Sequence, residues 1–285
     1  MKKVWILGGI LTILGGIIAI IGLGIGNKED FSQKSKGKQI TNSYSISDSF
    51  EIQVEDEDVR VIEKESGADI TVTYPETYEV EETENQLVVK RTKKSQTPWY
   101  RKIMLVWETK SEIVVQIPKE YEGSVTIEGT SSDIVWKSET PVLSNVNIKN
   151  VDGDIEIEGM KVLQEMNVKA MSGDITMKQS QVRDTAKVVS VDGEIRITDS
   201  TINSLIGKTT SGDIVTSALS SDSIEMHAID GDIVCKKLDG TYEEYSVQVN
   251  LVDGDSNISS KEYGRKRLEL QTTSGDIKVD FRGSK

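Results

Sequence analysis

One short phrase recurs through the second half of the chain, and it constrains the fold more than any other feature. From residue 131 onward an acidic residue follows a small residue, nearly always Gly, and precedes Ile in all copies but one. The acids of the eight copies are Asp133, Asp154, Asp174, Glu194, Asp213, Asp232, Asp255 and Asp276, at spacings of 21, 20, 20, 19, 19, 23 and 21 residues. A steady period near 20 residues indicates stacked units that cannot bury their apolar faces alone.

Each unit has the pattern of two short strands joined by a turn. In residues 145–158, apolar residues alternate with polar ones before Gly153 and again after it. Alternation with a period of two on both sides of a glycine indicates β-strands. The glycine suits a turn position with positive φ, and the side chain of the Asp or Ser before it can form a hydrogen bond with the local backbone.

Two arrangements satisfy this pattern. The units could stack as rungs of a β-solenoid at ~4.8 Å spacing, or each could be a hairpin in a meander or sandwich. The nearly equal lengths favour the solenoid, because each rung must close over its neighbour. We therefore expect an all-β, β-helix-like solenoid with rungs of about 20 residues over 131–285. One interior column should contain Ile134, Ile155, Ile175, Ile195, Ile214, Ile233 and Ile277.

Residues 50–130 show a less regular version of the same strand pattern. Strand-like pieces such as Phe50–Val54, Gln86–Lys90 and Glu112–Ile117 are separated by polar segments. We expect an irregular β region that begins the same sheet system, with a separate small β domain as the alternative.

The first 49 residues predict a membrane anchor and a tether. Residues 4–26 are 23 consecutive residues without a charge, which as a helix span roughly 34 Å, enough for the hydrocarbon core. A cleavable signal peptide is the rival, but its apolar region is shorter and ends in a small-residue cleavage site. We expect residues 1–3 in the cytoplasm, one transmembrane helix over 4–26, a polar tether over 27–49, and the bulk of the chain outside the cell. The lysines on the two sides of the span do not settle this orientation by count.

Composition excludes several functions. The net charge is −13, which opposes binding of nucleic acid because its phosphates are repelled. The single histidine, His227, and single cysteine, Cys235, exclude an internal disulfide and Cys-based or His-rich metal centres. The sequence therefore predicts no cofactor and no catalytic residues.

The acids of the recurring phrase are a candidate calcium column. Stacked carboxylates about 5 Å apart repel one another, so turn hydrogen bonds, water or cations must relieve them. Calcium-binding β-rolls have a nine-residue period with paired glycines, which this chain lacks. We expect structural turn residues, with a Ca²⁺ site at Asp154, Asp174, Asp213 and Asp232 as the alternative.

A basic segment interrupts this acidic chain. Over residues 90–107 the sequence has six positive charges, no acid and three aromatic residues. Such a segment can contact anionic headgroups or wall polymer, with its aromatic side chains at the interface. The alternative is a solvated hairpin tip. The candidate contact residues are Lys90, Arg91, Lys93, Lys94, Trp99, Tyr100, Arg101 and Lys102.

Together, the N-terminal span, the tether, the segment Ile113–Lys119 and the recurring Gly-Asp-Ile phrase resemble the LiaG-like family of Firmicutes. These proteins carry an adhesin-like domain of unknown function and are encoded beside a cell-envelope stress-sensing system. The resemblance implies a membrane-anchored, extracytoplasmic β-solenoid and implies no catalytic residue.

We therefore expect a non-enzymatic binding or structural protein of the bacterial cell envelope. Its partners would be the lipid bilayer through residues 4–26 and anionic lipid, wall polymer or another envelope protein. The alternative is a carbohydrate-active β-helix enzyme, which needs carboxylates that converge in a cleft. Rung lengths that vary by only four residues leave little material for the walls of such a cleft.

Overall fold

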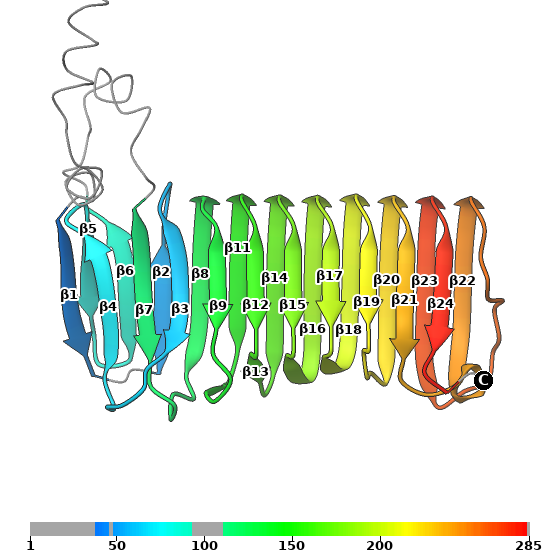
Figure 1. Cartoon of the computed structure of the whole chain (residues 1–285), viewed down its shortest axis with the longest axis horizontal. Helices are drawn as coiled ribbons and strands as arrows, with labels where there is room; N and C mark the ends of the chain where they lie inside the picture. Colours follow the sequence, from blue (N-terminus) through cyan, green and yellow to red (C-terminus); the bar gives the residue numbers. More distant parts are fainter. Residues whose placement is uncertain (1–37, 46–47, 93–110, 284–285) are drawn as a thin grey trace, which may run out of the picture. The chain divides into compact units, whose positions relative to one another are not determined.

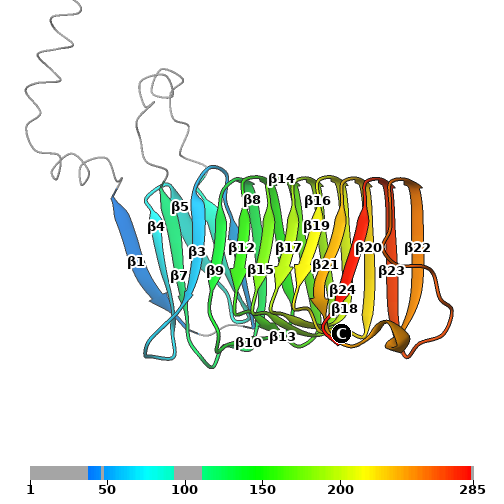
Figure 2. The ribbon, with the colours of Figure 1, turned by 45° about the vertical axis from the view of Figure 1, so that its right-hand side comes forward.

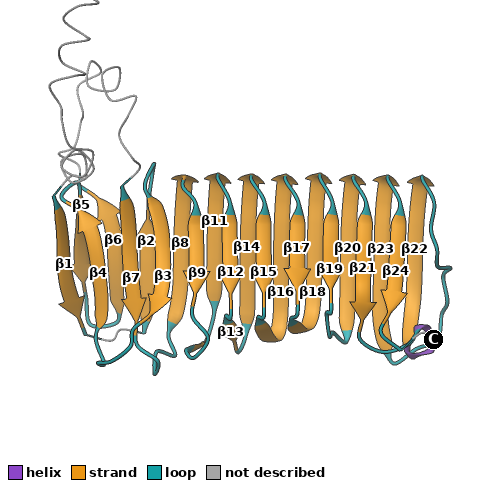
Figure 3. Cartoon of the chain, viewed as in Figure 1, coloured by secondary structure: helices purple, strands orange, loops and turns teal. Residues whose placement is uncertain are grey.

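The computed structural model describes residues 38–45, 48–92 and 111–283. The predicted span over 4–26 and six of the eight basic-segment residues lie outside these ranges. Within them, no helix is long and apolar enough to cross a membrane. The described strands all belong to one compact unit, and it is all β apart from one short 3₁₀ helix, η1 (Tyr242–Glu244) (Figure 3).

Two long sheets face each other (Figures 1 and 2). Sheet A contains, in spatial order, β1 (Gln39–Tyr44), β4 (Ile70–Pro75), β7 (Glu112–Ile117), β3 (Asp58–Glu63), β9 (Ile134–Lys137), β12 (Ile155–Glu158), β15 (Ile175–Lys178), β17 (Ile195–Thr198), β19 (Ile214–Ser217), β21 (Ile233–Leu238) and β24 (Ile277–Phe281). Sheet B contains β22 (Tyr245–Asp253), β23 (Lys266–Ser274), β20 (Ser223–Asp230), β18 (Thr201–Ser211), β16 (Gln181–Asp192), β14 (Glu165–Ser172), β11 (Val146–Asp152), β8 (Ser124–Ser131), β2 (Ser49–Gln53), β6 (Gln86–Arg91) and β5 (Tyr78–Glu82). Sheet B also includes two short strands off this path, β10 (Val142–Leu143) and β13 (Lys161–Val162), which pair with each other, and β13 also pairs with β16.

Each repeat except the seventh contributes one strand to each sheet, so the recurring turn connects the sheets and does not form a hairpin. The seventh contributes β22 to sheet B and pairs with sheet A only through an isolated bridge from Ser256 to Ile277. In the repeat around Gly153, β11 lies in sheet B and β12 in sheet A. Both pair in parallel with the equivalent strands of the repeats on either side. Alternate residues of β11 as far as Asn150, and of β12, are buried between the sheets, because alternate side chains of a strand point to opposite faces. The repeats therefore stack as the rungs of a solenoid-like fold.

The predicted isoleucine column is present. Along sheet A the residues pair in the order Ile134, Ile155, Ile175, Ile195, Ile214, Ile233 and Ile277. Each of these side chains is buried. The column is the centre of one continuous hydrophobic core.

The last two repeats stack in the reverse of their sequence order. β21 pairs with β24, so Ile233 lies beside Ile277, 44 residues later in the chain. In sheet B, β23 lies between β20 and β22, and β22 forms the edge. Figure 1 shows this as red strands between the yellow and orange ones. The chain places the seventh rung at the edge and then returns, so that the eighth rung fills the gap between the sixth and the seventh.

The strands before the repeats belong to the same two sheets. β3 pairs with β9 of the first repeat in sheet A, and β2 pairs with β8 in sheet B. The sheets end in antiparallel strands, β1 on β4 and β5 on β6. β1 lies within the segment expected to be a tether. Its Ile40 and Tyr44 pack against the core, and the hydroxyls of Tyr44 and Tyr74 lie 3.3 Å apart.

Candidate functional site

The turns of the recurring phrase require glycine for two reasons. Gly173 has a φ of +128°, a region that L-residues avoid. A Cβ atom on Gly173 would also lie 2.2 Å from the carbonyl oxygen of Gly153 in the neighbouring rung. Ser132, which takes the glycine's place in the first repeat, is not among the positive-φ residues of the described chain. The turns therefore stack backbone on backbone, with no room for a side chain.

The acids of these turns form a ladder of hydrogen bonds. The amide of Asp174, for example, donates to Oδ1 of Asp154 in the neighbouring rung at 2.9 Å. Equivalent bonds connect Asp58 with Asp133, Asp133 with Asp154, Asp174 with Glu194, Asp213 with Asp232, Asp232 with Asp276, and Asp276 with Asp255, at 2.8–3.1 Å. The carboxylates of Asp133, Asp154, Asp174, Asp213, Asp232 and Asp276 thus each accept a backbone N–H, which reduces the repulsion between neighbouring acids. The described residues contain no group of three or more Asp, Glu, His or Cys side chains placed to hold a metal ion.

A groove lies on the outer face of sheet B. Its volume is about 770 Å³. We call it the sheet B groove. Its lining residues come from the ends of β2, β6, β8, β11, β14 and β16 next to the glycine turns. They are Gln53, Val54, Glu55, Lys90, Arg91, Glu128, Gly129, Thr130, Lys149, Asn150, Val151, Lys169, Ala170, Met171, Val189 and Val191.

Two of the predicted basic-segment residues lie in this groove. Lys90 and Arg91 form the end of β6 and line one end of the hollow. Lys90 makes an ion pair with Glu81 at 2.5 Å, and Arg91 pairs with Glu55. The other predicted residues, Lys93, Lys94, Trp99, Tyr100, Arg101 and Lys102, are not described.

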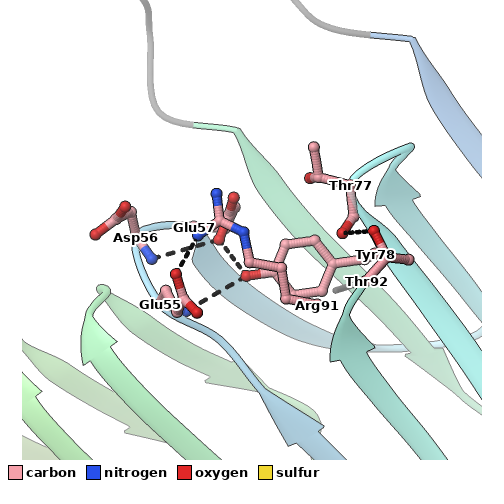
Figure 4. Close-up of polar contacts among 7 residues, drawn as sticks. All are labelled: Glu55, Asp56, Glu57, Thr77, Tyr78, Arg91 and Thr92. Atoms are coloured by element: carbon pink, nitrogen blue, oxygen red, sulfur yellow. Dashed lines mark hydrogen bonds and ion pairs between the residues drawn. The ribbon is translucent and has the colours of Figure 1, made fainter. Parts of the chain in front are cut away.

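Arg91 is fixed by a small polar cluster (Figure 4). The Tyr78 hydroxyl donates to the Glu57 carboxylate, which is almost fully buried, and the guanidinium lies beside them. Burial of the Tyr78 ring, followed by its bond to Glu57, raises the pKa of the phenol above its usual range. Burial alone would lower the pKa of Arg91, but the charges of Glu57 and Glu55 outweigh it and raise that pKa. Arg91 is therefore a fixed cation at the end of the groove.

The two carboxylates of the groove are both engaged. Glu55 pairs with Arg91, and Glu128 pairs with Lys149 at 2.9 Å. Paired carboxylates in an open groove differ from the convergent acid pair that glycoside cleavage needs. The groove offers cations beside apolar side chains, an arrangement suited to binding.

Sequence reasoning identified Lys90 and Arg91 and missed the rest of this groove. The signal was present in the alternation itself. With Ile148 and Asn150 pointing inward, Lys149 and Val151 must point outward, and the same holds in the next two repeats. An apolar residue in that outward position, two before the glycine, occurs at Val151, Met171, Val191, Ile229 and Val252.

Fold and surface together define an all-β repeat protein of two mainly parallel sheets with an exposed groove. The chain belongs to the Toastrack DUF4097 family, whose profile matches residues 47–285. A comparison with curated proteins gave no match.

Three solved structures show the same fold. A candidate adhesin of Bacteroides fragilis is 17% identical and has a TM-score of 0.54, with 85% of this chain and 97% of that chain covered. A candidate adhesin of Parabacteroides distasonis is 12% identical, with a TM-score of 0.54 and coverage of 86% and 98%. A protein of the same organism, described as a candidate lipid-binding protein, is 16% identical, with a TM-score of 0.51 and the same coverage.

Proposed function

We propose that this chain is a non-enzymatic binding protein of the bacterial cell envelope, anchored in the membrane by residues 4–26. The uncharged run of 23 residues supports the anchor. The similar folds of candidate adhesins and a candidate lipid-binding protein support binding on the extracytoplasmic side. The LiaG-like resemblance extends the proposal to a role during cell-envelope stress.

The proposed binding surface is the basic segment that begins at Lys90. The observation that carries this proposal is the position of Lys90 and Arg91 at the end of the sheet B groove, in a chain whose net charge is −13. Cations concentrated on one part of an acidic protein attract anionic polymers or headgroups, each contributing about 1 kcal/mol near an anionic membrane. Screening over a Debye length of ~8 Å makes such binding sensitive to salt.

Cosedimentation tests this surface. The chain from residue 28 is mixed with anionic vesicles or with purified wall polymer, at low and at moderate salt. We expect binding that weakens as salt rises and that is lost when the six cations of the segment become Gln. A matched control changes six other cations that have no ion pair in the described structure, namely Lys161, Arg183, Lys187, Lys236, Lys237 and Arg265. Absence of cosedimentation at either salt, or equal loss in the control, would refute the proposed surface.

Cell fractionation tests the anchor. The full chain should sediment with membranes and should be released by detergent, while the chain from residue 28 should be soluble. A full-length chain that is cut near residue 27 and recovered from the culture medium would contradict an uncleaved anchor.

A further inference from the structure

The sheet B groove carries apolar side chains that are unusual on the outer face of a sheet. Val151, Met171 and Val191 hold the same place in three consecutive repeats, and their side chains are 45%, 55% and 39% exposed. Val189, also in the groove, is partly exposed beside them. Exposed apolar side chains gathered on adjacent strands indicate a contact surface, whereas isolated ones are ordinary.

Two lysines lie directly beside this apolar row. Lys149 and Lys169 are neighbours across β11 and β14, so like charges stand on adjacent strands, about 4.8 Å apart. Like charges in this arrangement destabilise a sheet. Glu128 neutralises Lys149 from the other side, whereas Lys169 makes no ion pair within the described residues and has Val189 as its other neighbour. Among the described residues Lys169 is therefore a cation without an ion-pair partner, and it stands at the edge of an apolar surface.

The groove has an excess of positive charge at Lys149 and Lys169, where Glu128 pairs with one of the two lysines. At the other end, Lys90 and Arg91 are balanced by Glu81, Glu55 and Glu57. The chain around it has a net charge of −13, so this excess is local. A ligand that satisfies both features must carry a negative head and an apolar body.

We propose that the sheet B groove binds a single-chain anionic amphiphile, with its head at Lys149 and Lys169 and its apolar chain along Val151, Met171 and Val191. The volume of about 770 Å³ lies within the range of small-molecule sites. The groove crosses six neighbouring strands, from β6 to β16, which at ~4.8 Å per strand is about 24 Å of length. A linear ligand therefore fits along it.

This site uses residues of β11, β14 and β16, and it takes a monomeric ligand from solution. The proposed contact with a membrane or polymer surface uses the basic segment that begins at Lys90, at the other end of the same groove. Binding of the monomer can therefore succeed where vesicle binding fails, and the reverse.

Dodecyl phosphate below its micelle concentration is the probe. The full chain is reconstituted in nanodiscs of zwitterionic phosphatidylcholine, and binding is measured by calorimetry, with empty nanodiscs as the reference for partitioning. We expect saturable binding of dodecyl phosphate, with inorganic phosphate and dodecyl maltoside each binding at least about tenfold more weakly. A tenfold factor is what one charge-assisted hydrogen bond supplies.

Two substitutions and two matched controls test the assignment. Lys169→Gln and Met171→Ser should each weaken binding of dodecyl phosphate about tenfold or more. Lys187→Gln removes a lysine from the same face of sheet B outside the groove, and Ile229→Ser changes the equivalent repeat position of Met171 in a distant rung. Both controls should bind as the unchanged protein does.

Methyl NMR gives a measurement that does not depend on the variants. With ¹³C-methyl methionine labelling, the Met171 signal should shift as dodecyl phosphate is added, and the signal of the buried Met226 should not. Binding that Lys169→Gln leaves unchanged, equal losses in the two controls, or a Met171 signal that stays fixed at saturation would each overturn the proposal.

Discussion

Replacement of Gly173 by alanine should be among the most damaging single changes in the solenoid. The new Cβ would lie 2.2 Å from the oxygen and 2.7 Å from the carbon of the Gly153 carbonyl. Both atoms are backbone, so no side chain can rotate away and the turn itself must move. The φ of +128° adds strain that is absent for glycine.

The magnitude follows from the bonds that this movement disturbs. A non-glycine residue in such a region costs roughly 1–3 kcal/mol. The displaced turn also weakens the bond from the Gly173 amide to Asp192 O at 3.0 Å and the bond from the Asp174 amide to Asp154 Oδ1 at 2.9 Å. At about 1 kcal/mol each, the total loss is about 3–5 kcal/mol. That is a large part of the ~5–15 kcal/mol by which folded domains are stable.

Gly207 provides the matched control. It is buried in β18, and a Cβ there would lie 3.7 Å from the nearest atoms, Ile214 Cγ2 and Met226 Cγ, an ordinary contact distance. Gly207→Ala should therefore be neutral or stabilising by up to about 1 kcal/mol. Urea unfolding of the chain from residue 28, followed by circular dichroism, measures both. A Gly173→Ala variant within about 0.5 kcal/mol of the unchanged protein, or an equally unstable Gly207→Ala variant, would refute the stacked-turn reasoning.

Three further outcomes are expected from the same unfolding assay. In the described structure no side chain accepts a hydrogen bond from the Asp213 amide, so the ladder is interrupted at Glu194. Glu194→Asp should restore the missing bond and stabilise the fold by about 1 kcal/mol. A lower midpoint of urea unfolding would contradict this. Ala218→Gly should stabilise the fold by about 1 kcal/mol, because Ala218 has a φ of +53°, which is strained for a residue with a Cβ. An unchanged urea midpoint would mean that this turn is unstrained. Burial raises the pKa of the Cys235 thiol to about 11, so stability should fall as pH rises from the ordinary thiol value of about 8.5 through 11. A Cys235→Ala variant that loses stability equally steeply over that range would exclude the thiol as the cause.

Local sequence patterns predicted the two strands and the turn of each rung, because strand alternation and turn chemistry depend only on neighbouring residues. The Ile155 and Ile175 positions and the need for glycine at Gly173 follow from period-two alternation and from the equal repeat lengths. The strand over residues 39–44 was missed, because its apolar residues, Ile40 and Tyr44, are too few to show a period. The sheet B groove was missed because it forms only when outward positions of separate repeats are brought side by side.

The order of the last two rungs is a long-range property, but the sequence holds a signal for it. The residue before each turn glycine, or before Ser132 in the first turn, is Asp or Ser. In sequence order Ser and Asp alternate from one repeat to the next, except where Asp230 is followed by Asp253. In the spatial order it is unbroken: Ser131, Asp152, Ser172, Asp192, Ser211, Asp230, Ser274 and Asp253. Placing the eighth rung between the sixth and seventh therefore keeps every Asp of this column beside Ser, which avoids like charges on adjacent strands.

This argument predicts an interaction between two distant positions. Ser274→Asp should lower stability, by an amount within the ~0.2–1 kcal/mol range of cross-strand pairs, because the introduced carboxylate would stand between Asp230 and Asp253. Adding Asp230→Ser should restore part of the loss, and salt should reduce the effect by screening. A double-mutant cycle in urea measures this coupling. If the rungs stacked in sequence order, residues 230 and 274 would not be neighbours, so strictly additive effects would contradict the reversed order of the last two rungs.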